Sequence, residues 1–225
     1  MDIHKPKPVH GWRELLSEIG VIVIGVLIAL AGEQAVEAYH WHEDVKEASA
    51  TLDGQLQDAM FAATERTMIS DCTDQQIASL QAIVAGRGRT PPLWLPINAR
   101  PWSTSAWQSI TASNVLGHMT IEDRLNYAGA FGMIDALRGW NREEFDLWSD
   151  IGTLEMPSVL SDTARDRLQS DLARVSKLNM VISVSSQQLI DAVHAAGITL
   201  NADNRQQIGE EQARGCRMPT VPRSN

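Results

Sequence analysis

Cysteine is scarce in this sequence, and the motifs that mark common enzymes and metal sites are missing. The 225 residues include two cysteines, Cys72 and Cys216, with neither a CxxC pair nor zinc-site spacing. There is no GxSxG, HExxH or SxxK, and GRGRTPP lacks the GKS or GKT ending of a phosphate loop. In HWHED, His40 and Asp44 stand four apart on one helix face, but two ligands do not make a metal site. The sequence therefore predicts a protein that is not an enzyme and holds no cofactor or metal.

Basic residues are too few to balance the acidic ones. Lysine and arginine number 19 against 28 acidic residues, which gives a net charge of −9. An acidic body repels phosphate backbones, so we expect no nucleic-acid partner. Hydrophobic residues make up 44% of the chain and charged residues 21%, which is typical of a chain that folds.

Long apolar runs are limited to one, EIGVIVIGVLIALAGEQ, at residues 18–34. Its uncharged part, from Ile19 to Gly32, has 14 residues and would be roughly 21 Å long as a helix, shorter than a hydrocarbon core of roughly 30 Å. Further apolar residues extend this surface past the glutamate at each end, namely Leu15, Leu16, Ala35, Val36 and Ala38. We therefore expect one transmembrane helix over residues 14–39.

Aromatic residues flank the run at the separation of a bilayer. Trp12 precedes it, and Tyr39 and Trp41 follow 27 and 29 residues later. In a helix that separation is about 40 Å, close to the thickness of a bilayer with its headgroups, where tryptophan and tyrosine gather. Trp12, Tyr39 and Trp41 are therefore the predicted interfacial anchors.

Two other interpretations of the run remain open. VIVIGVLIAL has the length of a signal-peptide core, and ALAGEQA offers small residues for cleavage. Against cleavage, Glu14 and Glu18 occupy the part of a signal peptide that normally carries only positive charge. A helix buried in a soluble core is the third interpretation.

The charges on either side of the run predict its orientation. Three basic side chains lie within residues 1–13, whereas the charges from Glu33 to Glu47 are mainly acidic. The positive-inside rule places the short tail 1–13 in the cytoplasm and a helical domain over residues 40–214 in the periplasm of a Gram-negative host. The predicted location is the bacterial inner membrane, and residues 215–225 are predicted to form a flexible C-terminal tail.

The two cysteines would then lie in an oxidising compartment. A Cys72–Cys216 disulfide is a candidate there, and it would close a loop of more than a hundred residues. Such a loop is worth roughly 4–5 kcal/mol in the chain-entropy model. Two unpaired thiols are the alternative.

Small residues gather on one face of the expected transmembrane helix. Alternating steps of four and three residues align Gly25, Ala29 and Gly32 with Glu18, and Ile22 and Val36 belong to the same row. Gly25 and Ala29 form a small-xxx-small pair, which lets another helix approach closely. We predict helix–helix packing at these three small residues, with lipid and either another membrane protein or a second copy of the chain as partners. Glu18 and Glu33 would reach headgroup water at the two interfaces, or Glu18 would pair with a basic partner.

The rest of the chain is predicted to be helical, with no alternating β pattern and no internal repeat. The first helix should continue to Val84, with interruptions at Gly54 and SDCTD, and a Pro/Gly-rich loop over 86–103 should follow. A helix is predicted from Ser103 or Thr104 to about Gly117, and another near 203–213. Between them, a Thr120–Asp123 capping box should open a helix that runs to about Leu154 along Ile121, Leu125, Ala128, Ile134 and Leu137. The next helix should carry a seam that faces other helices and should end at Gly197, with the seam positions Leu168, Leu172, Val175, Asn179, Ile182, Ser186, Leu189 and Val193. The predicted fold is all-α, one transmembrane helix continuing into a periplasmic antiparallel helical bundle.

Two stretches together resemble a known family. EIGVIVIGVLIALAGEQ after a basic start, and AWQSITASNVLGHMTIEDRLNYAGAF further on, are similar to a family of uncharacterised single-pass bacterial membrane proteins with an IGVLIAL-type anchor. In the second block the family's common glycine is Asn114 here, and its paired tyrosines are reduced to Tyr127. The resemblance implies a membrane location and a helical extracytoplasmic domain, but no activity. The matching positions are Glu18, Gly25, Leu27, Ile28, Ala29, Leu30, Trp107, Ser113, Leu125 and Tyr127.

Three functional hypotheses follow from these patterns. The leading one is a non-enzymatic accessory or scaffolding subunit of a membrane complex. The alternative is a periplasmic module that senses a small ligand and signals through a partner protein. A periplasmic enzyme of unrecognised type is the third.

Overall fold

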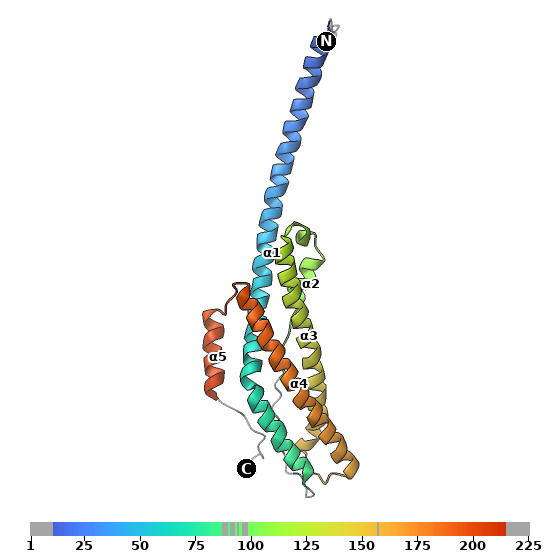
Figure 1. Cartoon of the computed structure of the whole chain (residues 1–225), viewed down its shortest axis with the longest axis vertical. Coiled ribbons are helices and arrows are strands. Elements are labelled where there is room, and N and C mark those ends of the chain that lie inside the picture. Colours follow the sequence, from blue (N-terminus) through green and yellow to red (C-terminus); the bar gives the residue numbers. More distant parts are fainter. Residues whose placement is uncertain are drawn as a thin grey trace, which may run out of the picture. The chain divides into compact units, whose positions relative to one another are not determined.

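The structure is a computed structural model that describes residues 11–86, 90, 93, 95, 99–156 and 158–214, and every regular element among those residues is a helix. Figure 1 shows the helices in chain order, and no strand occurs within those ranges. The chain divides into two compact units, Met1–Glu47 and Ala48–Asn225. The all-α prediction is confirmed for the described part of the chain.

The longest helix, α1 (Trp12–Ala85), passes without a break from the first unit into the second. The interruptions predicted at Gly54 and SDCTD are absent, so that prediction is wrong. A single exposed glycine costs a helix only about 1 kcal/mol relative to alanine. The polar stretch stays helical, and within it Thr73 Oγ1 donates to the Ile69 carbonyl at 3.0 Å, which satisfies the hydroxyl inside the helix.

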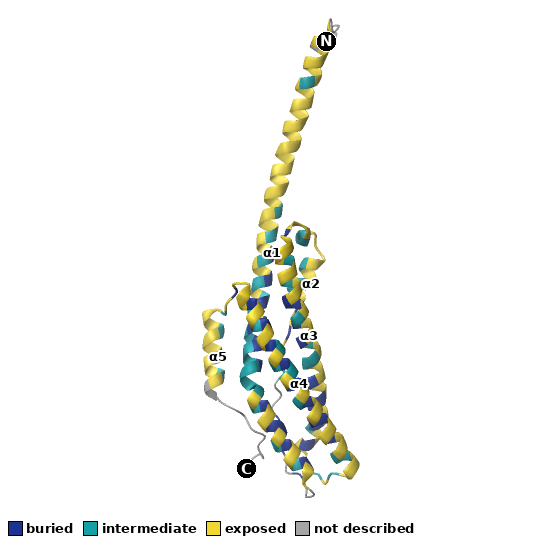
Figure 2. Cartoon of the chain, in the orientation of Figure 1, coloured by how far each residue is buried: buried dark blue, intermediate teal, exposed yellow. Residues whose placement is uncertain are grey.

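In the second unit, α1, α3 (Ile121–Ile151) and α4 (Asp162–Ala195) bury a shared apolar core. Figure 2 shows the buried positions gathered on the facing sides of these three helices. Every predicted seam position that was named on α4 is buried, including the polar Asn179 and Ser186. On α1 the buried apolar residues recur mainly at steps of three and four, the spacing of one helix face, at Ala48, Leu52, Leu56, Ala59, Met60, Ala63, Ile77, Leu80 and Val84.

The start of α3 is capped as predicted, but its first turns face outward. Thr120 Oγ1 accepts a hydrogen bond from the Asp123 backbone N–H at 3.1 Å, which satisfies one of the free donors of the first turn. Ile134 and Leu137 are buried as predicted, whereas Ile121 and Leu125 are 69% and 67% exposed, and Ala128 is also exposed. The prediction is wrong for the first turns because the buried face of α3 lies on another side of the helix, which Ile134 and Leu137 share with Ala130.

Contacts between α1 and α3 show that these helices run in the same direction. Near the start of both, Tyr127 Oη donates to Asp53 Oδ1 at 2.7 Å, and further along both, Arg66 Nη2 contacts Glu144 Oε1 at 2.8 Å. The long connection between the two helices, over residues 86–120, allows this because a parallel pair needs a return crossing.

α4 runs against both of its neighbours. The Asn179 side chain donates to the Ser70 carbonyl at 3.0 Å, and Arg174 pairs with Glu143 at 2.8 Å. Near the start of α4, the Arg165 guanidinium donates to the Val84 carbonyl at the C-terminal end of α1. An antiparallel arrangement is therefore not confirmed for the bundle as a whole, because α1 and α3 are parallel.

Shorter elements complete the second unit. The helix predicted from Ser103 or Thr104 to about Gly117 is two pieces, α2 (Ser105–Thr111) and η1 (Val115–His118). After α3 comes η2 (Gly152–Glu155), close to the predicted end at Leu154, and α5 (Ala202–Arg214) matches the predicted helix near 203–213.

Gly197 ends α4 as predicted. Its φ is +79°, a left-handed conformation that favours glycine, and the Ile198 N–H returns to the Val193 carbonyl at 3.2 Å. The predicted flexible tail at 215–225 lies outside the described residues.

Candidate functional site

The first feature with functional content is the apolar, exposed stretch of α1 in the first unit. Its most apolar window of 18 residues has a mean hydropathy of 2.4, and none of that window is buried by the rest of the chain. An exposed apolar surface of this length marks a site for lipid or for another protein. By length and composition, α1 is a helix that could cross a membrane. The large exposed side chains are Leu15, Leu16, Ile19, Val21, Ile22, Val23, Ile24, Val26, Leu27, Ile28, Leu30 and Val36.

The three predicted interfacial aromatic residues lie on this one helix. Trp12 and Tyr39 are 75% and 65% exposed, and Trp41 Nε1 donates to Glu37 Oε1 at 3.4 Å. The Tyr39 ring also packs edge-on against His40, with ring centroids 6.2 Å apart. Because α1 is unbroken between Trp12 and Tyr39, their separation along the axis is about 40 Å, the thickness of a bilayer with its headgroups.

The predicted packing residues Gly25, Ala29 and Gly32 are all exposed. A Cβ atom placed on Gly25 or Gly32 would meet nothing within 4 Å, so no contact in the described chain requires glycine there. The described chain therefore leaves this small-residue face open.

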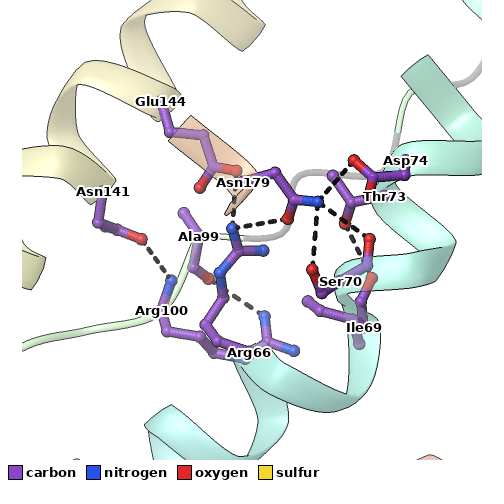
Figure 3. A network of polar contacts seen from close by, with 10 residues as sticks. All are labelled: Arg66, Ile69, Ser70, Thr73, Asp74, Ala99, Arg100, Asn141, Glu144 and Asn179. Atoms are coloured by element: carbon purple, nitrogen blue, oxygen red, sulfur yellow. Dashed lines mark hydrogen bonds and ion pairs between the residues drawn. The ribbon is translucent and has the colours of Figure 1, made fainter. Parts of the chain in front are cut away.

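The second feature is a buried polar cluster, which we call the Arg66 layer and define as Arg66 of α1, Glu144 of α3 and Asn179 of α4. Arg66 Nη2 lies 2.8 Å from Glu144 Oε1 and 3.4 Å from Asn179 Oδ1, as Figure 3 shows. The Asn179 amide nitrogen donates in turn to the Ser70 carbonyl at 3.0 Å and to Asp74 Oδ1 at 2.9 Å. One layer thus connects the three long helices of the second unit.

The Arg66 layer is sealed from solvent and incompletely bonded. The side chains of Arg66 and Glu144 are 0% and 1% exposed. Arg66 Nε and Nη1 and Glu144 Oε2 are buried without a hydrogen-bond partner among the described residues. Burial raises the pKa of the Glu144 carboxyl and lowers the pKa of the Arg66 guanidinium, and the attraction between the two charges opposes both shifts.

A second arginine braces the loop beside this layer. Arg100 Nε donates to Glu65 Oε2 at 2.8 Å, and the Arg100 backbone N–H donates to Asn141 Oδ1 at 3.0 Å. Figure 3 shows Arg100 and its bond to Asn141 next to Arg66. Arg100, shortly before α2, is therefore bonded to both α1 and α3 beside the buried ion pair.

Sequence reasoning identified one member of this layer and missed the other two. Asn179 stood out as one of two polar residues, with Ser186, in a mainly apolar seam. Arg66 and Glu144 gave no comparable signal, since each looks like an ordinary charged residue of a helix and 78 residues separate them.

The remaining predicted residues show no built chemical site. No group of three or more His, Cys, Asp or Glu side chains in the described ranges could hold a metal ion. Cys72 Sγ accepts a hydrogen bond from Gln76 Nε2 at 3.5 Å. Cys216 lies outside the described residues, so the Cys72–Cys216 disulfide stays a prediction. Comparisons with protein-family models, with curated proteins and with solved structures gave no match to this chain.

Proposed function

We propose that this chain is a non-enzymatic, single-pass protein of the bacterial inner membrane, and that it acts as an accessory or scaffolding subunit of a membrane complex. One observation carries the proposal: α1 holds an exposed apolar stretch between aromatic residues and then continues, without a break, into a packed helical bundle. A helix of this kind would tether the bundle to the bilayer.

The charge distribution supports an orientation with the N-terminus in the cytoplasm and the bundle in the periplasm. Three basic residues, Lys5, Lys7 and Arg13, precede the apolar stretch closely, and the excess of acidic residues lies after it. An oxidising periplasm would also permit the Cys72–Cys216 disulfide. Non-reducing and reducing electrophoresis of the purified chain tests that pairing, since a disulfide-closed loop of this length migrates faster than the reduced chain.

The character of the bundle interior supports a structural role over catalysis. Its polar cluster, the Arg66 layer, is shielded from solvent, so a substrate would have no access to it in this conformation. Helix-connecting polar groups in a core often set register rather than perform chemistry. The face of the anchor with Gly25, Ala29 and Gly32 is open for helix packing.

A topology experiment tests this proposal. We would fuse alkaline phosphatase, which is active only outside the cytoplasm, to the C-terminus of the full chain, and a fluorescent protein that folds only in the cytoplasm in a matched fusion. The proposal predicts phosphatase activity and no fluorescence. The reverse pattern contradicts the orientation, and activity released into the soluble periplasm contradicts the anchor.

The sensing alternative is favoured by one observation, the unpartnered buried atoms of Arg66 and Glu144. A small polar ligand would satisfy them, as would one or two buried water molecules. A high-resolution crystal structure of the full chain decides between these, because electron density larger than water beside Arg66 would support sensing and discrete water would count against it.

A further inference from the structure

The open face of α1 that holds Gly25, Ala29 and Gly32 also holds a carboxylate. Gly25, Ala29 and Gly32 follow Glu18 at successive steps of seven, four and three residues, so all four positions lie on one side of the helix. Glu33 directly follows Gly32 and lies at the edge of the same face. We call this surface the Glu18 face.

When α1 spans a bilayer, at least one of these two carboxylates lies within the hydrocarbon, where a charged side chain is costly. A spanning helix needs about 20 residues in the hydrocarbon, and the uncharged stretch between Glu18 and Glu33 has 14. Any 20-residue window that includes this stretch therefore contains Glu18 or Glu33. Charged side chains at such depth are usually paired or face another helix.

The described chain supplies no such pairing. Glu18 and Glu33 are exposed, and neither makes an ion pair or hydrogen bond within the part of the chain that the structure describes. The opposite side of the helix carries large apolar residues, Val23, Leu27 and Leu30, which suit lipid. The Glu18 face also holds the apolar residues Ile22 and Val36, so what distinguishes it is the carboxylate and the small residues, which let a neighbouring helix approach closely.

The charge on the Glu18 face decides between a second copy and a different protein. Two copies insert with the same orientation, so a symmetric pair packed on this face would bring Glu18 to the depth of Glu18 of the other copy. Two carboxylates at close range repel each other, most strongly away from water. A lysine or arginine at that depth would instead neutralise Glu18 while the small residues allow close backbone approach.

We propose that the Glu18 face binds a transmembrane helix of a different protein that carries a basic side chain at the depth of Glu18. This proposal rests on the proposed membrane insertion of α1 and specifies the chemistry of the partner. It assigns lipid to the Leu27 side and the partner helix to the Ala29 side.

Energy transfer in vesicles tests the proposal. The dye-labelled full chain is reconstituted in phosphatidylcholine vesicles with a labelled leucine-rich probe helix, which has a single lysine, leucine or glutamate at the depth of Glu18. We expect the lysine probe to bind about tenfold more tightly than the leucine probe, and Glu18→Gln to abolish that preference. Glu18→Lys should transfer the preference to the glutamate probe.

A matched pair of variants tests the face itself. Ala29→Leu should weaken binding of the lysine probe about fivefold or more, whereas Leu27→Ala on the opposite side should leave it unchanged. Equal binding of the lysine and leucine probes, or stronger energy transfer between two copies of the chain than with the lysine probe, would overturn the proposal. Alkaline extraction of the same vesicles separates the two claims. Release of the chain refutes membrane insertion, while retention without lysine preference refutes only the basic partner.

Discussion

Breaking the buried ion pair of the Arg66 layer should be far more damaging than breaking an exposed pair beside it. Glu144→Leu leaves the Arg66 guanidinium in the core without its counter-charge, at a site where both side chains are at most 1% exposed. Removal of one partner from a buried pair typically costs about 3–5 kcal/mol. In a domain of roughly 150–250 residues, that lowers Tm by about 6–20 °C.

The chain supplies its own control at the adjacent residue. Glu143 contacts Arg174 at the same distance, 2.8 Å, but their side chains are 47% and 56% exposed. Solvent screens such a pair, so Glu143→Leu should change stability by no more than about 1 kcal/mol. The assay is thermal unfolding of the full chain in mild detergent, followed by circular dichroism at 222 nm.

A double variant makes the reasoning refutable. Arg66→Met with Glu144→Leu removes both charges and their unpartnered atoms, so the double variant should be more stable than Glu144→Leu alone and close to the wild type. Two results would show that the cluster is not a coupled buried pair. One is that Glu144→Leu lowers stability no more than Glu143→Leu. The other is that the stability losses of Arg66→Met and Glu144→Leu, each measured alone, add up to the loss of the double variant.

Three further predictions concern pH, backbone conformation and capping. Burial raises the pKa of Glu144 above its ordinary value of 4.5, so the folded chain keeps that proton after the unfolded chain has lost it. Wild-type stability should therefore fall relative to Glu144→Gln as pH rises from 4.5 through the folded pKa, and a relative gain over that range in urea titrations would contradict this. Gly197→Ala should destabilise by about 1 kcal/mol because φ is +79°, whereas Gly132→Ala, in an exposed part of α3 with no neighbour within 4 Å of the added Cβ, should stabilise by about 0.5–1 kcal/mol in the same melts. If both glycine variants raised stability, or both lowered it, the argument from backbone conformation would be refuted. Thr120→Ala should cost about 1 kcal/mol through loss of the α3 cap, and an unchanged Tm would show that the 3.1 Å bond contributes nothing.

Periodic apolar spacing predicted most of the bundle because a core selects it directly. The seam on α4 and its end at Gly197 could be predicted since each depends on residues within one helix. Ile121 and Leu125 show where such spacing fails. A helix can carry apolar residues on two sides, and only the packing partners determine which side is buried.

The polar cluster could not be predicted for a related reason. Arg66 and Glu144 become partners only because α1 and α3 run in parallel, which depends on the long connection between them rather than on local pattern. Gly54 and the SDCTD segment were predicted to interrupt α1 from local propensity, but packing of the neighbouring apolar residues outweighs that small cost.

The anchor was recognisable in the sequence since hydropathy and flanking aromatic residues are local properties. The structure adds that nothing in the described chain covers it and that its helix is continuous with the bundle. Its orientation and its partner depend on molecules outside this chain, so charge asymmetry and the Glu18 face give predictions for them rather than observations.

The most direct test of membrane anchoring is the intact mass of the chain recovered from bacterial membranes after an alkaline carbonate wash. The account predicts that the chain stays in the membrane pellet with its full mass of 24.8 kDa. Recovery in the wash, or a mass that corresponds to a chain beginning after Ala31, would contradict it.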